Sequence, residues 1–227
     1  VVTWMPTGLP VGRKGAKFSE VFSKNRNINW LSAARLFLFG ARDVWFVVGV
    51  PIYFYAVLSD GSEAGNRAAF FMIGTFMAVW TILYGVVQGW SPRILRAGSR
   101  SEMQLHAQAA RWVASLAVVP AVLAVVVWLV PEASMGLTTL IVTGLLLFGG
   151  LFAVNSALHS YLILSFTDAS RVTMDVGFYY MSNAAGRLAG TVLSGLTYQL
   201  GGLPLCLGTA ALMIGLSWLA VKRLETA

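Results

Sequence analysis

Apolar residues along the chain fall into six runs, each long enough to cross a bilayer, and short polar segments separate the runs. An α-helix needs roughly 20 apolar residues to span the hydrocarbon core, and lipid offers no partner to open backbone groups. The pattern therefore predicts an all-α membrane protein with a bundle of six transmembrane helices. The predicted helices cover residues 31–58, 68–91, 109–129, 137–163, 176–200 and 203–221.

The segments outside these runs suggest how the chain is organised. Residues 1–30 begin with the apolar string VVTWMP and continue as a polar, basic stretch, which is typical of a helix end followed by a cytoplasmic linker. Residues 31–221 form the bundle, and residues 222–227 form a short tail. The opening string leads us to expect that this chain is a fragment and that a preceding part is missing.

Composition supports the membrane interpretation and charge gives an orientation. Apolar residues make up 57% of the chain and charged residues only 11%, against about a quarter in soluble domains. The net charge of +7 does not indicate nucleic acid, because the basic residues are spread between the apolar runs. Nearly all of them fall in segments on one side, which predicts a multi-pass protein of the plasma or inner membrane with both ends in the cytoplasm.

Two arginines lie deep inside apolar runs. Arg42 and Arg187 each follow the start of their run by eleven residues, or roughly 16 Å, which places both near the bilayer midplane. Buried ionisable groups at such depth mark substrate or ion pathways. Two guanidinium forks at one level suit a phosphate or carboxylate group, and the alternative is that one arginine pairs with Asp43 or caps helix carbonyls.

Asp43 is the candidate for proton coupling. A carboxylate in a partly dehydrated cavity can carry a proton, although a structural ion pair with Arg187 or Arg35 explains the residue equally well. Asp43 and Arg42 point about 100° apart on a helix and need not pair. Arg35 lies near the cytoplasmic boundary, where its long side chain is expected to reach the headgroups.

Further polar residues repeat at intervals of four. Tyr179 and Asn183 precede Arg187 on one face of the fifth run, and Asn155 and His159 share a face of the fourth. These four join Arg42 and Arg187 as predicted substrate-binding residues. His159 is either a proton relay or a histidine hydrated at the membrane boundary.

No catalytic arrangement accompanies these residues. The chain has one cysteine, two histidines outside any HExxH frame and no GxxxxGK loop, so the sequence predicts neither an enzyme nor a cofactor or metal site.

Two strings carry a resemblance to a known family: FLFGARDVWFVVGVP (37–51) and DVGFYYMSNAAGRLAGTVLSGLTYQLGGL (175–203). They resemble the organoarsenical efflux transporters of the major facilitator superfamily, and the likeness covers most of the chain from about residue 18. The resemblance implies the C-terminal six-helix half of such a transporter, whose N-terminal half would supply the opposite wall of the cavity.

The resemblance also implies a substrate. Members of the family export 1-arseno-3-phosphoglycerate, a product of a glyceraldehyde-3-phosphate dehydrogenase, and thereby confer arsenate resistance. Proton-coupled antiport is typical of the superfamily and would give Asp43 its role. The superfamily's usual acidic residue is missing after Gly89, where Arg93 and Arg96 follow. The alternative is a major facilitator exporter of another small anionic or drug-like solute.

Overall fold

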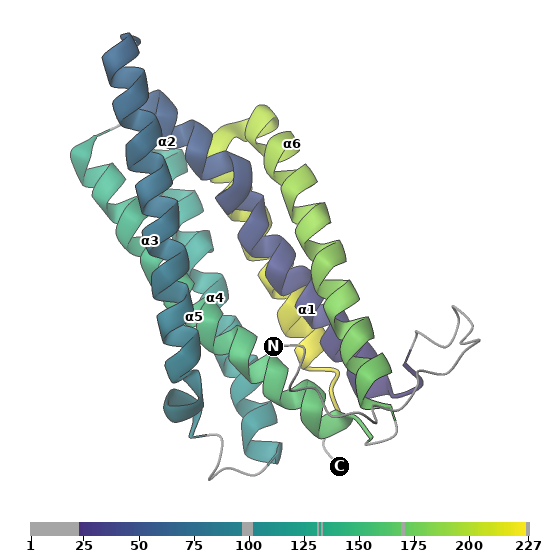
Figure 1. The fold of residues 1–227 in the computed structure, drawn as a ribbon. Coiled ribbons are helices and arrows are strands. Elements are labelled where there is room, and N and C mark those ends of the chain that lie inside the picture. Colours follow the sequence, from purple (N-terminus) through teal and green to yellow (C-terminus); the bar gives the residue numbers. More distant parts are fainter. Residues whose placement is uncertain (1–22, 97–101, 131, 133, 169–170, 226–227) are drawn as a thin grey trace, which may run out of the picture.

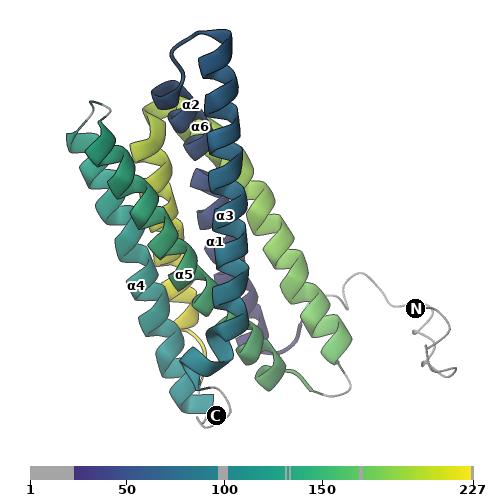
Figure 2. The ribbon, with the colours of Figure 1, turned by 60° about the vertical axis from the view of Figure 1, so that its left-hand side comes forward.

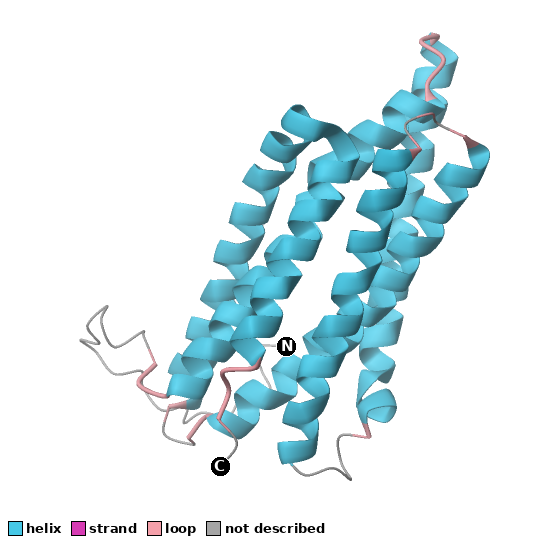
Figure 3. Cartoon of the chain, turned by 180° about the vertical axis from the view of Figure 1, so that it is seen from behind, coloured by secondary structure: helices cyan, strands magenta, loops and turns pink. Residues whose placement is uncertain are grey.

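A computed structural model describes residues 23–96, 102–130, 132, 134–168 and 171–225, and every regular element among them is a helix (Figure 3). The elements are α1 (Arg26–Val44), the π-helix η3 (Trp45–Gly49), α2 (Val50–Leu58), α3 (Glu63–Leu95), α4 (Glu102–Leu129), α5 (Met135–Phe166) and α6 (Val172–Val221). α1, η3 and α2 run on as one helix, and the described part contains five helices long and apolar enough to cross a membrane. The predicted all-α class is confirmed, and these helices are consistent with a membrane protein.

α6 is one element by assignment but is broken in the middle. Gly201 and Gly202 leave helical geometry, and Gly202 has a φ of 62°, which a residue with a side chain rarely adopts. The break falls between the predicted fifth and sixth runs. Residues 172–200 form one arm of α6 and residues 203–221 form the other.

α1 is packed against both arms of α6. A Cβ added at Gly186 would overlap the Leu36 carbonyl oxygen, and one at Gly190 would overlap that of Gly40, so the first arm approaches α1 backbone to backbone. From the second arm, the Ser217 hydroxyl donates to the Ala34 carbonyl at 2.8 Å. α1 is thereby packed between the two arms of α6, which are distant from α1 in the sequence (Figure 1).

The remaining helices form a second group beside this one. α3 packs on α5, and α4 packs on both α5 and α6, which joins the groups (Figure 2). At one end of the bundle, Asn25 donates to the Phe166 carbonyl at 2.8 Å and Arg26 pairs with Glu225 at 2.6 Å. The start of α1 and the ends of α5 and α6 therefore meet there.

Polar caps explain why the helices are longer than the apolar runs that predict them. Asn25 accepts from the Asn27 amide at the start of α1, Ser62 from the Gly65 amide at α3, and Ser134 from the Leu137 amide at α5. Each cap satisfies a backbone donor that the helix itself leaves open. The starts of α1, α3 and α5 are thus set by capping residues rather than by the first apolar residue.

The π-helix η3 interrupts the first span directly after Asp43 and Val44. The Ser194 hydroxyl of α6 accepts from the backbone amides of both Val48 and Gly49 at 3.2 Å. Pro51 follows and has no amide hydrogen to donate. A side chain from the neighbouring helix therefore supplies the hydrogen bonding that this turn disturbs.

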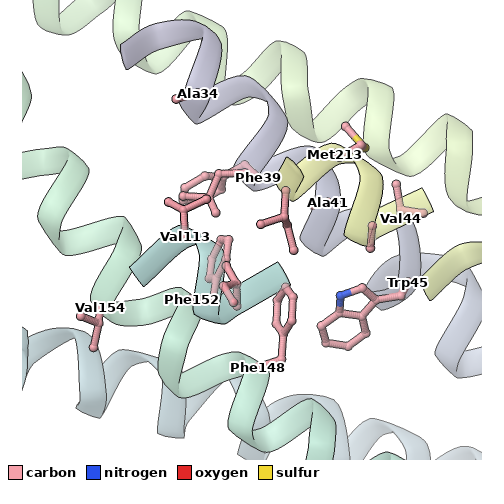
Figure 4. Packing of buried hydrophobic residues seen from close by; sticks show 14 of the residues in the cluster. Ala34, Phe39, Ala41, Val44, Trp45, Val113, Phe148, Phe152, Val154 and Met213 are labelled. Carbon is pink, nitrogen blue, oxygen red and sulfur yellow. The ribbon is translucent and has the colours of Figure 1, made fainter. Parts of the chain in front are cut away.

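An aromatic column lies between α1 and α5 (Figure 4). Phe39 meets Phe152 edge to face with ring centres 5.0 Å apart, Phe152 stacks on Phe148, and Phe148 meets Trp45 at 5.2 Å. These contacts fix α5 beside α1. They also make Phe39 and Phe152 neighbours of the arginines on α1.

Candidate functional site

Arg42, Asp43 and Arg187 meet in one ion group, called here the Asp43 group. Arg42 Nε lies 2.6 Å from Asp43 Oδ1, and Arg187 Nε lies 3.1 Å from Asp43 Oδ2. The Asp43 side chain is only 2% exposed. The expectation that Arg42 and Asp43 need not pair is wrong, because the Arg42 side chain folds back onto the next residue.

The two arginines of this group have different surroundings. The Arg42 side chain is 13% exposed and lies over the rings of Phe39 and Phe152, at 5.2 and 5.5 Å from their centres. The Arg187 side chain is 57% exposed. In a bilayer, a guanidinium that faced acyl chains would be strongly unfavourable.

Arg35 is a buried residue, and its expected reach to the headgroups is wrong. It is 4% exposed, and its Nη1 donates to the Ser156 carbonyl and hydroxyl at 3.0 and 3.1 Å. Its guanidinium lies 4.0 Å from the Phe39 ring centre and 4.9 Å from that of Tyr179. Among the described residues it has no ion-pair partner, and Nε has no hydrogen bond.

Position in the sequence did not reveal this role. Arg35 lies seven residues before Arg42, so both occupy the same side of α1 and share the Phe39 ring. That spacing is visible in the sequence. The distance of Arg35 from the cytoplasmic end of its apolar run suggests a surface position, whereas the side of α1 on which it lies, shared with Arg42, determines its burial.

His159 is fully buried, which excludes the alternative that it is hydrated at a membrane boundary. Neither ring nitrogen has a hydrogen-bond partner in the described structure. His159 follows Ser156 by three residues on α5, which places it beside the residue that binds Arg35. Its predicted role as a proton relay stays a prediction.

Asn155 shares this burial but contacts a different helix. Its Nδ2 donates to the Trp112 carbonyl of α4 at 3.1 Å and to the Leu151 carbonyl of its own helix at 2.9 Å. Its Oδ1 is buried without a partner. These bonds give Asn155 a structural part in joining α4 to α5, and its role toward substrate stays a prediction.

The predicted polar face of Tyr179, Asn183 and Arg187 is divided between two environments. Tyr179 is fully buried against Arg35 with no well-aligned hydrogen bond at its hydroxyl, Asn183 is half-buried with an unpartnered Oδ1, and Arg187 reaches Asp43.

We call Arg35, Ser156, His159 and Tyr179 the Arg35 cluster. It lies beside the Asp43 group, with Phe39 between them.

Charge is unbalanced across these two sets of residues. Arg42 and Arg187 share the single carboxylate of Asp43, and Arg35 has no carboxylate partner among the described residues; uncompensated charge inside a membrane protein is strongly unfavourable. Donor-rich, positively charged surroundings match an oxyanion. In the part of the chain that the structure describes, no three His, Cys, Asp or Glu side chains gather as metal ligands would.

No protein-family model, curated protein or solved structure matches this chain.

Proposed function

We propose that this protein exports a small anionic solute across a membrane. The observation that carries the proposal is the excess of positive charge: among the described residues, Arg42 and the half-exposed Arg187 share the carboxylate of Asp43, and the buried Arg35 has no carboxylate partner. A bound oxyanion would supply the missing negative charge. The exposed side of Arg187 supports a water-filled path or a second helical bundle against α6.

The proposal extends to architecture. With the break at Gly201–Gly202 taken as a boundary, the five long helices are compatible with six spans, the number in one half of a major facilitator transporter. A partner bundle of six helices would cover the Arg187 side and complete the cavity. We place this half in the plasma or inner membrane with both ends in the cytoplasm, in agreement with the positions of its basic residues.

For the solute we propose 1-arseno-3-phosphoglycerate, supplied by a glyceraldehyde-3-phosphate dehydrogenase, so that the protein confers arsenate resistance. Support comes from the strings at residues 37–51 and 175–203, which resemble the organoarsenical efflux transporters. Both strings belong to the contact between α1 and α6, and they contain Arg42, Asp43 and Arg187.

Proton coupling follows from competition at Asp43. In the described state its carboxylate binds Arg42 and Arg187 together. A proton on Asp43 removes the charge that holds both guanidinium groups and frees them for the solute. Solute and proton would then bind in a linked way, as an antiporter requires.

The test is arsenate resistance of cells that express the full-length transporter together with the dehydrogenase. Arg187→Lys keeps the charge but loses the paired donors, so it should fail nearly as badly as Arg187→Gln, at about 1.5–3 kcal/mol per lost charge-assisted bond. Arg67→Gln changes an exposed arginine of α3 and serves as the matched control. Membrane levels of each variant are measured by blot.

Two results would contradict the proposal. Resistance that does not depend on the dehydrogenase would reject the organoarsenical solute and favour another small anion or a drug-like compound. Near-normal resistance of Arg187→Lys would reject binding through the guanidinium fork.

A further inference from the structure

The Arg35 cluster brings together buried polar atoms that have no partner. These atoms are Arg35 Nε, both ring nitrogens of His159 and the Tyr179 hydroxyl, which has no well-aligned hydrogen bond although Ser160 lies close to it, and none of the three residues is more than 4% exposed. They come from α1, α5 and α6. Buried polar groups are nearly always satisfied, so several open donors in one place point to an absent ligand.

The three residues lie at one level of the bundle. Arg35 follows the start of α1 by nine residues, Tyr179 follows the start of α6 by seven, and His159 precedes the end of α5 by seven. The start of α1 and the end of α5 are joined by the bond from Asn25 to the Phe166 carbonyl. Direct contacts agree, since Arg35 binds Ser156 and lies over the Tyr179 ring.

The chemistry of the open atoms selects the ligand. A guanidinium N–H, a phenol O–H and an imidazole N–H are all donors, and the cluster carries a positive charge without a carboxylate. A cation would be repelled. A water molecule would satisfy hydrogen bonds but leave the charge uncompensated, whereas a phosphate-like oxyanion supplies both acceptors and charge.

We propose that the Arg35 cluster binds one oxyanion end of the transported solute and that Arg42 and Arg187 bind the other. Seven residues separate Arg35 from Arg42, which is about 10 Å along the helix, so the solute class is small molecules with oxyanion groups at both ends. This inference rests on the proposed function. It adds Arg35 as the residue that selects doubly anionic solutes.

The experiment measures binding to the purified full-length protein by isothermal titration in nanodiscs of phosphatidylcholine. The probes are 3-phosphoglycerate, which has a phosphate and a carboxylate, glycerate, which lacks the phosphate, and inorganic phosphate. The variants are Arg35→Gln and Tyr179→Phe, with Arg26→Gln as the control because Arg26 lies on the same helix and pairs with Glu225 at the surface.

The expected result is that 3-phosphoglycerate binds the wild-type protein at least tenfold more tightly than either single-ended probe. Arg35→Gln should weaken 3-phosphoglycerate at least tenfold, and Tyr179→Phe should weaken it by about tenfold, the usual effect of one hydrogen bond to a charged group. Arg26→Gln should bind as the wild type does.

Tyr179→Phe separates ligand binding from folding. Tyr179→Phe removes a hydroxyl whose neighbour is the Ser160 side chain and breaks no ion pair, so the melting temperature without ligand should change little. Weaker binding by a protein of equal stability supports the proposal. Unchanged binding by both Tyr179→Phe and a folded Arg35→Gln overturns it, even if cells keep their arsenate resistance.

Two other outcomes also decide the matter. Loss of 3-phosphoglycerate binding when phosphatidylglycerol is added to the nanodiscs would mean that a lipid headgroup fills the cluster, which overturns the solute assignment. Absence of binding by the wild type, together with absence of dehydrogenase-dependent resistance, overturns the proposed function as well.

Discussion

The Asp43 group and the Arg35 cluster both hold positive charge beside Phe39, yet they compensate it differently. In the Asp43 group one carboxylate contacts two guanidinium groups at 2.6 and 3.1 Å. In the Arg35 cluster the guanidinium has only the carbonyl and hydroxyl of Ser156 and two aromatic rings. The first arrangement has a carboxylate counter-ion shared by two arginines, and the second has no counter-ion among the described residues.

This difference shows that burial alone does not distinguish a charged residue that stabilises the fold from one that belongs to a functional site. An internal counter-ion makes a charge part of the fold, and its loss leaves partners without compensation. A buried charge without a counter-ion is unfavourable for stability, and such groups are concentrated at functional sites. Substitutions should therefore lower the free energy of unfolding strongly in the Asp43 group and little or not at all in the Arg35 cluster.

The largest effect is expected for Asp43→Ala. The change leaves Arg42, nearly buried, and Arg187 without a carboxylate, and removing one member of a buried ion pair costs about 3–5 kcal/mol, less here because Arg187 is half exposed. Denaturant titration in detergent measures the loss. Glu63→Ala is the control, since its pair with Arg67 is exposed and is worth at most about 1 kcal/mol. Equal losses in both variants would remove the distinction.

The next largest effect is expected for Gly186→Ala, which tests the close contact between α1 and α6. The new Cβ overlaps the Leu36 carbonyl oxygen, so α1 and α6 must separate, at about 1–3 kcal/mol. Gly195→Ala on the same arm is the matched control, because nothing lies within 4 Å of its Cβ position. That control should be neutral or stabilising, since Ala favours helices over Gly by up to about 1 kcal/mol. The same denaturant titration applies.

The smallest effect on stability is expected for Arg35→Met. It removes two hydrogen bonds to Ser156 but also a buried charge without a counter-ion, so the terms offset and the free energy of unfolding should change by less than about 1 kcal/mol, or rise. Thermal unfolding of the ligand-free protein measures the change. A loss as large as that of Asp43→Ala would make Arg35 a structural residue.

Much of the fold is predictable because lipid restricts the chain to helices. The apolar runs located every long helix and the break after residue 200, but the helix ends differed because caps such as Asn25 and Ser62 lie outside the runs. The π-helix η3 was not predicted. Its geometry depends on the Ser194 hydroxyl of another helix, which local sequence cannot reveal.

The sequence predicts how deep the arginines of the candidate site lie in the bundle, but not which residues they contact. Equal distance from the helix starts brought Arg42 and Arg187 to one level, where both meet Asp43. Arg35 is predicted to reach the headgroups but is buried against Ser156 of α5. The direction of its side chain depends on which face of α1 packs on α5, and local sequence does not show this. Tyr179 was grouped with Arg187 by spacing, yet it contacts Arg35, since a four-residue step drifts around the helix by about 40°.

We call the π-helix η3 the elbow of the first span, because the regular α-helical hydrogen bonding is interrupted there. Before it, α1 is packed between the arms of α6; the main chain of η3 itself is bound to α6 through the Ser194 hydroxyl, and α2 continues beyond it. We expect bending of this span to concentrate at the elbow, because one side-chain contact gives way at lower cost than a ladder of helical bonds. Since Asp43 lies two residues before η3, the swing of the outer segment would change the angle at which this carboxylate meets its arginines.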